Sequence, residues 1–263
     1  MILDPVNSIT SVNFYKKIST QSLGRSILYL CYLAALFSIT GTVALKVKAG
    51  PVIKETFRWL EQSMPPLTFS RGKVSSPVSG PLTLRHPKMA EVALIIDTQR
   101  GEPATPELMG EQKVIAYLTG NALYLLRSRN RVESYDFSKS PSRTVVVNAE
   151  FYRMAEKTLR QILYPIAIAA IFVMFLAWKT CASLMYSLIA LAVNAQADAR
   201  LGYKSLFNIT VYAQTLVIAL QAIFLFMPVG IPLFRLAAFA LTGLYIWLAV
   251  NKIAAPQTPE PAA

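Results

Sequence analysis

The chain has 263 residues, of which 54% are hydrophobic and only 15% are charged, and its mean hydropathy is +0.43. Soluble globular proteins contain roughly 25% charged residues, and here the apolar residues come in long blocks, which excludes an ordinary soluble domain and predicts an integral membrane protein. The formal net charge is +12, but no basic cluster is interleaved with aromatic residues, so we expect lipid headgroups and no nucleic acid as its partner.

The residue types that most often carry catalysis and metal binding are scarce. Cys31 and Cys181 both lie in apolar runs, and His86 is the single histidine. This leaves little material for a metal site or a hydrolytic triad. The sequence also has no phosphate-binding glycine loop and no nucleophile-elbow motif. We therefore expect a protein that is not an enzyme and that uses no metal ion and no cofactor.

The N-terminal part of the chain leads into a first apolar run. Residues 1–25 are interpreted as an interfacial segment with a short helix, whose aromatic side chains lie at headgroup depth. The run Ser26–Leu45 is about twenty residues long, beyond the roughly 7–15 apolar residues of a signal peptide. It is interpreted as an uncleaved membrane anchor.

Residues 50–158 form the polar section and are interpreted as a water-exposed, β-rich domain with flanking helices. Pro51 suits the first turn of an amphipathic helix that continues to Ser63. Short β-like runs follow, and the pair Val114–Leu118 and Leu123–Leu126 gives the clearest hairpin signal. Both faces of these two runs are apolar, so we expect them to lie centrally in a sheet that is covered on each side.

Three further apolar runs follow the polar section. The run Ile162–Val193 is longer than a bilayer requires at 1.5 Å per residue, and we expect one helix that leaves the membrane at a polar end, with a possible kink at Pro165. The three prolines of the tail favour disorder. The predicted segments are the interfacial residues 1–25, transmembrane helix 1 (26–49), the water-exposed domain (50–158), a long transmembrane helix 2 (159–194), a polar link (195–205), transmembrane helix 3 (206–227), a tight turn (228–232), transmembrane helix 4 (233–251) and a disordered tail (252–263).

The fold class is thus an α-helical membrane protein with about four transmembrane helices and one inserted, β-rich (α+β) water-exposed domain. An even number of spans places both termini on the side opposite the 50–158 domain. Positive charge near the helix ends does not decide which side is cytoplasmic, because six basic residues lie on each side. Long loops cross a membrane largely regardless of charge, and we expect the domain to lie outside the cytoplasm.

One span, an inserted β-rich domain and a C-terminal group of spans resemble a known arrangement. The segments that carry the likeness are Leu67–Gly72, the run Ile95–Thr98 followed by Gly101, and the two strands of the hairpin. They resemble the bacterial membrane family known as domain of unknown function 1189, which includes proteins labelled maltodextrin-utilisation membrane proteins. The resemblance implies a multi-pass protein of the bacterial cytoplasmic (inner) membrane, an extracytoplasmic domain and no assigned catalytic residues.

Two basic side chains lie near membrane depth. Lys179 and Arg235 are candidates for a ligand pathway, because ionisable residues within spans are costly and often functional. The structural alternative is that both side chains extend to the interface, Arg235 just after Pro232 and Lys179 beside Trp178.

Three further polar residues are candidates for ligand binding or helix packing. Asp97 follows an apolar strand and could bind a ligand, or could cap the turn that continues to Gly101. Gln214 and Gln221 are seven residues apart and therefore share one face of helix 3, while Ser183 and Ser187 share a face of helix 2. In lipid such side chains usually bond to a neighbouring helix, but they could also line a path.

We therefore expect a non-catalytic, multi-pass membrane protein whose extracytoplasmic domain binds a partner or ligand in an accessory, sensing or assembly role. Its expected partners are the lipid bilayer and another membrane or envelope protein, with the small-molecule ligand unidentified. The alternative is a transporter, or a component of one, with a polar path between helices 2 and 3.

Overall fold

The structure is a computed structural model that describes residues 2–88, 92–128, 131–139, 144–227 and 232–255. The chain divides into two compact units. We call Met1–Val47 together with Leu163–Ala263 the helical unit, and Lys48–Ile162 the mixed unit. Two long helices, α3 (Leu23–Ser63) and α5 (Ala149–Gln196), contribute residues to both units.

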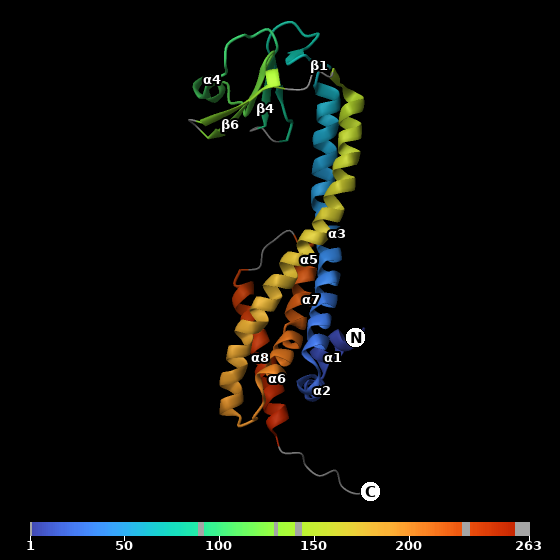
Figure 1. Cartoon of the computed structure of the whole chain (residues 1–263), viewed down its shortest axis with the longest axis vertical. Helices are drawn as coiled ribbons and strands as arrows, with labels where there is room; N and C mark the ends of the chain where they lie inside the picture. The colour runs from blue at the N-terminus through green and yellow to red at the C-terminus, as the bar shows by residue number, and fades with distance from the viewer. Residues whose placement is uncertain (1, 89–91, 129–130, 140–143, 228–231, 256–263) are drawn as a thin grey trace. The chain divides into compact units, whose positions relative to one another are not determined.

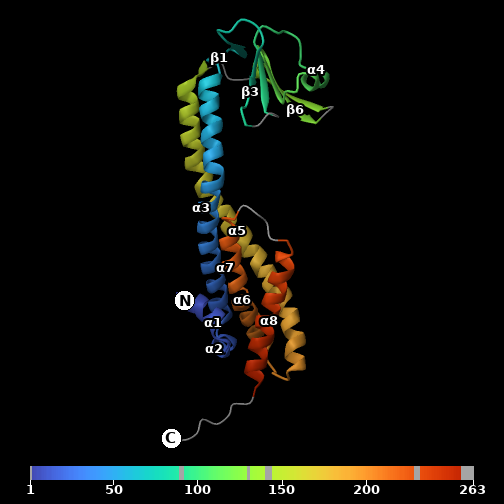
Figure 2. The same ribbon diagram turned by 180° about the vertical axis from the view of Figure 1, so that it is seen from behind.

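In its described part, the helical unit contains α-helices and no β-strands. Besides its portions of α3 and α5, it contains α1 (Asp4–Thr10), α2 (Phe14–Thr20), α6 (Tyr203–Ala213), α7 (Thr215–Phe224) and α8 (Phe234–Ala254). The described residues include four helices long and apolar enough to cross a membrane, with α6 and α7 counted as one span. The most buried of these is the α6–α7 span, and α6 packs against α1, α2 and α8 (Figures 1 and 2).

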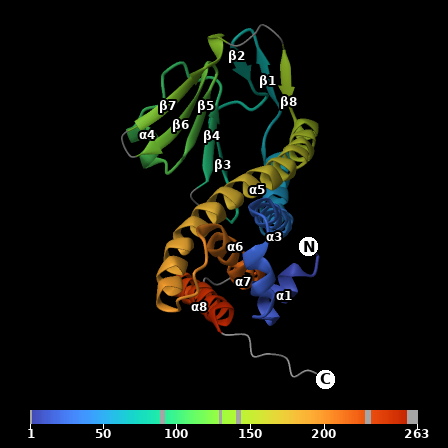
Figure 3. The same cartoon turned by 60° about the horizontal axis from the view of Figure 1, so that its bottom comes forward.

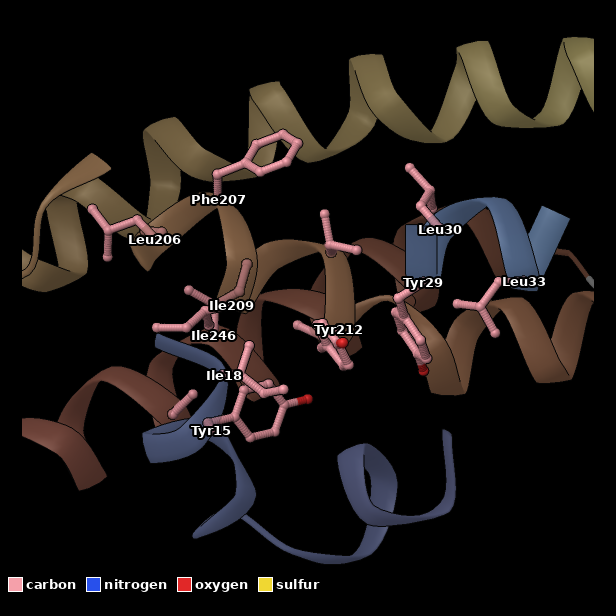
Figure 4. Close-up of a cluster of buried hydrophobic side chains, with 14 of the residues drawn as sticks. Tyr15, Ile18, Tyr29, Leu30, Leu33, Leu206, Phe207, Ile209, Tyr212 and Ile246 are labelled. Atoms are coloured by element: carbon pink, nitrogen blue, oxygen red, sulfur yellow. The ribbon is translucent and has the colours of Figure 1, made fainter. Parts of the chain in front are cut away.

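The core of the helical unit is centred on α6. Tyr29 of α3 lies beside Tyr212 (Figure 4), and their rings stack with centroids 3.9 Å apart. The Tyr29 hydroxyl hydrogen-bonds the Thr215 hydroxyl at 2.9 Å. Asn208 of α6 accepts a hydrogen bond from Ser26 at 2.8 Å. Buried tyrosine and amide side chains need such partners for their polar ends, so α6 is held by both apolar and polar contacts.

The N-terminal residues differ from the prediction of one short helix, and their position at the membrane interface stays a prediction. They form two short helices, and Tyr15 and Ile18 of α2 are each only 1% exposed (Figure 4). Tyr15 also donates a hydrogen bond to the Ser8 carbonyl at 2.9 Å. The apolar side chains of α2 gain more by burial against α6 and α8 than by lying at a surface.

The predicted helix boundary near Pro51 was wrong. Helix α3 continues from Leu23 to Ser63 with Pro51 in its interior. A proline inside a helix removes one hydrogen bond, here the bond that its N–H would donate to the Val47 carbonyl. The neighbouring Gly50 carbonyl accepts a hydrogen bond from Arg160 of α5 at 3.1 Å, which supports the helix at this point. The run Ile162–Val193 lies within the single helix α5, with Pro165 inside it.

The mixed unit contains two small sheets. Its elements are β1 (Leu67–Ser70), β2 (Lys73–Ser75), β3 (Leu82–Arg85), β4 (Ala93–Asp97), α4 (Pro106–Glu111), β5 (Ala116–Thr119), β6 (Ala122–Ser128), β7 (Arg131–Asp136), a 3-10 turn (Phe137–Lys139) and β8 (Val145–Val147). The strand orders are β2-β1-β8 and β3-β4-β5-β6-β7 (Figure 3). The predicted hairpin is confirmed, because β5 pairs with β6 in antiparallel register. The central strand β5 also pairs with β4 in parallel.

Both faces of the larger sheet are covered, as the sequence predicted for the hairpin. Tyr117 of β5 belongs to a cluster with Met109 of α4 on one face, and Leu118 belongs to a cluster with Leu67 of β1 on the other. The predicted combination of long apolar helices with one β-containing unit is therefore confirmed, while the position of the chain in a bilayer stays a prediction.

Candidate functional site

Residues of α3, α5, α7 and α8 and of their ends line an open cavity of about 760 Å³ in the helical unit. Eight of its lining residues are apolar or aromatic, and the three polar ones are Lys179, Gln221 and Arg235. These are three of the five candidates from the sequence. The cavity is lined by Phe37, Phe175, Trp178, Lys179, Gln221, Phe224, Leu225, Leu233, Phe234, Arg235 and Leu236.

Lys179 is the buried cation of this cavity. Its side chain comes from α5, only 4% of the residue is exposed, and Nζ lies 5.4 Å from the ring centroid of Phe175, one turn earlier on the same helix. Phe175 in turn stacks on Phe37 of α3, with centroids 4.1 Å apart. The ammonium group therefore lies against an aromatic face, which attracts a cation but supplies no negative charge.

Acidic residues are almost absent from the helical unit. Its sequence contains only Asp4, Asp198 and Glu260. Asp4 lies 4.0 Å from Arg25, Asp198 lies 3.2 Å from Arg200, and Glu260 falls outside the described residues. Within the described part of the chain, Lys179 therefore has no carboxylate partner, and an anion in the cavity would have to come from another molecule.

The first turn of α8 adds a second positive element. Leu233, at the N-cap with φ +60°, gives no side-chain cap to the helix, and Arg235 follows two residues later. Uncapped N–H groups and the helix dipole make such a terminus favourable for an anion. Phe224 of α7 packs edge-on against Phe234 with centroids 4.9 Å apart, so this turn lies directly beside α7 and Gln221.

Gln214 lies outside the cavity and packs α6 against α5. The residue is 1% exposed, and its Nε2 donates to the Ser183 hydroxyl at 2.8 Å and to the Thr210 carbonyl at 3.3 Å. The Ser183 hydroxyl donates to the Lys179 carbonyl, and Ser187 donates to the Ser183 carbonyl. A seam of buried polar side chains thus continues from Lys179 along α5. It consists of Ser183, Ser187 and Gln214, and Gln214 bonds directly to Ser183.

Asp97 lies in the mixed unit at the end of β4, apart from the other candidates. Its carboxylate accepts a hydrogen bond from the Tyr117 hydroxyl at 3.3 Å, and the Arg100 guanidinium lies 5.6 Å from the Tyr117 ring centroid. Burial raises the pKa of Tyr117 above its ordinary value, which keeps the hydroxyl protonated as a donor. The turn after Asp97 is closed by the Arg100 N–H and the Asp97 carbonyl at 3.2 Å. Asp97, Arg100 and Tyr117 therefore form a cluster whose contacts support the fold at the end of β4.

The aromatic walls of the cavity were not singled out in the sequence. Phe37, Phe175 and Phe224 come from three different helices, and each sits in an apolar run where an aromatic side chain is unremarkable. The sequence analysis also did not identify Asn208, which is buried and bonds Ser26. A polar amide within an apolar run was the signal available for its buried role.

Comparison with known protein families identifies the family of this chain. Residues 6–250 match the family described as "Protein of unknown function (DUF1189)". No curated protein and no solved structure matches the chain. The matched region includes every residue of the cavity and both sheets. As the resemblance predicted, the chain belongs to the DUF1189 family of proteins of unknown function.

Proposed function

We propose that this protein is a non-catalytic membrane protein that binds an anionic ligand in the cavity of its helical unit. The observation that carries the proposal is Lys179, a buried cation without a carboxylate partner among the described residues. Arg235 and the uncapped first turn of α8 line the same cavity. That the protein is not an enzyme remains part of the proposal.

Burial of a charged side chain is unfavourable unless another group compensates the charge. An unpaired ammonium group in apolar surroundings costs several kcal/mol, and a lysine near a helix end usually avoids this by extending to the interface. Arg235 is exposed and can do so. Lys179 is 4% exposed with Nζ against the Phe175 ring, so an anionic ligand offers the compensation that the protein does not supply.

Thermal unfolding of the protein in a neutral detergent tests this function. We expect stabilisation by glycerol phosphate or dodecyl phosphate, reaching about 2.7 kcal/mol at a free concentration 100 times Kd. Lys179→Met should abolish the stabilisation, whereas Lys204→Met, which removes an exposed charge on α6, should leave it intact. Equal responses of wild type and Lys179→Met to both compounds would refute binding at this cavity.

A transport role is the second candidate, because the cavity lies between α5 and α7, within the predicted helices 2 and 3. The buried Oε1 of Gln214 has no partner among the described residues. The Nε2 atom of the same amide donates to Ser183, which continues the polar seam from Lys179. Anion flux in proteoliposomes that Gln214→Leu and Gln221→Leu both abolish would support transport. Binding of dodecyl phosphate without anion flux would support the binding role and contradict transport.

We further propose that the mixed unit is the extracytoplasmic domain of a protein of the bacterial cytoplasmic membrane, where it meets a membrane or envelope protein. The family membership supports this proposal, since the family resemblance implied that location. Four candidate spans would place both termini on the opposite side of the membrane from the mixed unit.

A further inference from the structure

The size of the cavity points to a ligand larger than an inorganic ion. This inference rests on the proposed function and concerns the class of the anion. A volume of about 760 Å³ lies within the roughly 300–1,000 Å³ of pockets that hold drug-sized molecules. A bare phosphate or sulfate would leave most of the eight apolar and aromatic lining residues without a partner. The ligand that fills the site must combine an anionic group with an apolar part.

The rim of the cavity indicates where this ligand comes from. Trp178, Leu233 and Leu236 line the cavity, yet they are 71%, 76% and 64% exposed. They belong to α5 and to the start of α8, two helices apolar enough to cross a membrane. A large exposed tryptophan beside leucines suits the boundary between lipid headgroups and acyl chains. The cavity therefore opens onto a surface that lipid would surround.

The polar side chains of the cavity match a phosphate group. Arg235 offers a planar, forked set of N–H donors and Lys179 a compact charge, and both are common phosphate ligands in proteins. The Gln221 amide and the N–H groups at the start of α8 can contribute neutral hydrogen bonds. Phe37, Phe224 and Leu225 provide apolar wall for the glycerol backbone and the first carbons of the acyl chains.

We infer that the cavity binds the headgroup of an anionic phospholipid taken from the surrounding bilayer. The phosphate lies between Lys179 and Arg235, and the acyl chains leave past Trp178 and Leu236 into the membrane. A zwitterionic headgroup fits less well, because its own ammonium group would meet the two cations in a cavity with no described carboxylate.

Competitive lipid retention tests this inference. The full-length protein, in a neutral detergent, is incubated with equal amounts of phosphatidylglycerol and phosphatidylethanolamine, and native mass spectrometry counts the lipid that stays bound. We expect the wild type to retain phosphatidylglycerol in preference to phosphatidylethanolamine. Lys179→Met should weaken phosphatidylglycerol binding by roughly tenfold or more, as for the loss of one partner of a buried charge pair. Lys179→Arg should restore it, and Lys204→Met should behave as wild type.

Two outcomes would overturn the inference in different ways. Equal retention of both lipids, unchanged by Lys179→Met, would mean that only non-specific lipid contacts the helices. Lys179-dependent binding of glycerol phosphate without a preference for phosphatidylglycerol would overturn the lipid assignment and leave the proposed anion-binding function standing. If Lys179→Met does not fold, Arg235→Gln replaces it, because Arg235 is exposed and its loss should weaken retention without disturbing the core.

Discussion

Lys179 combines two roles that oppose each other. It is 4% exposed and faces Phe175, and no carboxylate among the described residues pairs with it. The buried charge therefore destabilises the ligand-free protein. In the proposed function, the same charge attracts the anion. Binding sites often keep such unfavourable groups, and replacing them raises stability at the expense of function. Ligand affinity and intrinsic stability should therefore change in opposite directions when this side chain is replaced.

Lys179→Met should raise the free energy of unfolding of the lipid-free protein by about 1–3 kcal/mol, because an apolar side chain of similar length removes the buried charge. Reversible unfolding in mixed detergent, followed by circular dichroism, measures the change. Lys179→Arg keeps the charge and should give no gain. A loss of stability in Lys179→Met would mean that the ammonium group has a stabilising partner in the protein.

A charge pair in the mixed unit has a smaller, pH-dependent effect. Arg127 donates a 2.8 Å hydrogen bond to Glu133 across the β6–β7 pair, and this bond holds the pKa of Glu133 below its ordinary value of 4.5. A lowered pKa stabilises the folded state above pH 4.5, and the contribution is lost as the pH falls through the lower value.

Glu133→Gln should therefore remove a small acid-dependent part of the stability of β6 and β7. Hydrogen exchange of their amides, compared between pH 6 and pH 3, measures it. The wild type should lose more protection than the variant over this interval, and both should be alike at the acid end. Identical pH dependence in the two proteins would show that the pair contributes nothing measurable, as many exposed pairs do.

At the scale of the elements, the turn between β5 and β6 shows why the hairpin could be predicted from the sequence. Two apolar runs flank a short polar segment with Gly120, a local signal that needs no knowledge of distant residues. The structure adds a reason for the glycine itself. A Cβ at Gly120 would lie 2.5 Å from the Thr98 carbonyl oxygen, so a side chain cannot be accommodated without moving backbone.

Gly120→Ala should destabilise the mixed unit by about 1–3 kcal/mol through this clash. Gly110→Ala is the matched control, because a Cβ there meets nothing within 4 Å and alanine favours helix α4 by roughly 0.5–1 kcal/mol. Denaturant unfolding, followed by the fluorescence of Trp59 in a chain with Trp178→Phe and Trp247→Phe, measures both variants. Equal stability of the two alanine variants would contradict a clash at Gly120.

The elements that were mispredicted share one physical cause, which is support from distant residues. Pro51 favours a helix start by local rules, but the Arg160 side chain donates to the adjacent Gly50 carbonyl from 110 positions along the chain. Ile18 and Tyr15 are buried against α6 and α8, which follow more than 180 residues later. Local periodicity carries no information about such partners.

For the whole molecule, the sequence identified part of the candidate site but not its assembly. Lys179, Gln221 and Arg235 were recognisable because polar residues are rare and costly in apolar runs. Nothing local indicated that these three converge on one cavity while Gln214 bonds to Ser183. Convergence follows from the packing of α5, α7 and α8, which only the fold reveals.

The sidedness of the mixed unit is testable on intact cells. A single cysteine at the exposed Ser128, in a chain with Cys31→Ala and Cys181→Ala, should react with a membrane-impermeant maleimide before lysis if the unit is extracytoplasmic. A cysteine at the exposed Lys204 serves as the opposite-side control and should react only after lysis. The reverse pattern would place the mixed unit in the cytoplasm and direct the search for partners there.

The distance between Lys179 and a lipid phosphate shows whether the cavity holds an anionic lipid. Solid-state NMR of lysine-¹⁵N-labelled protein in phosphatidylglycerol bilayers can detect dipolar coupling between side-chain nitrogen and phosphorus. Lysines at the membrane surface give couplings of their own, so the test is the difference between variants. We expect one coupled signal at hydrogen-bond range that is missing in Lys179→Met and retained in Lys204→Met. The same set of coupled signals in wild type and Lys179→Met would contradict anion binding in the cavity.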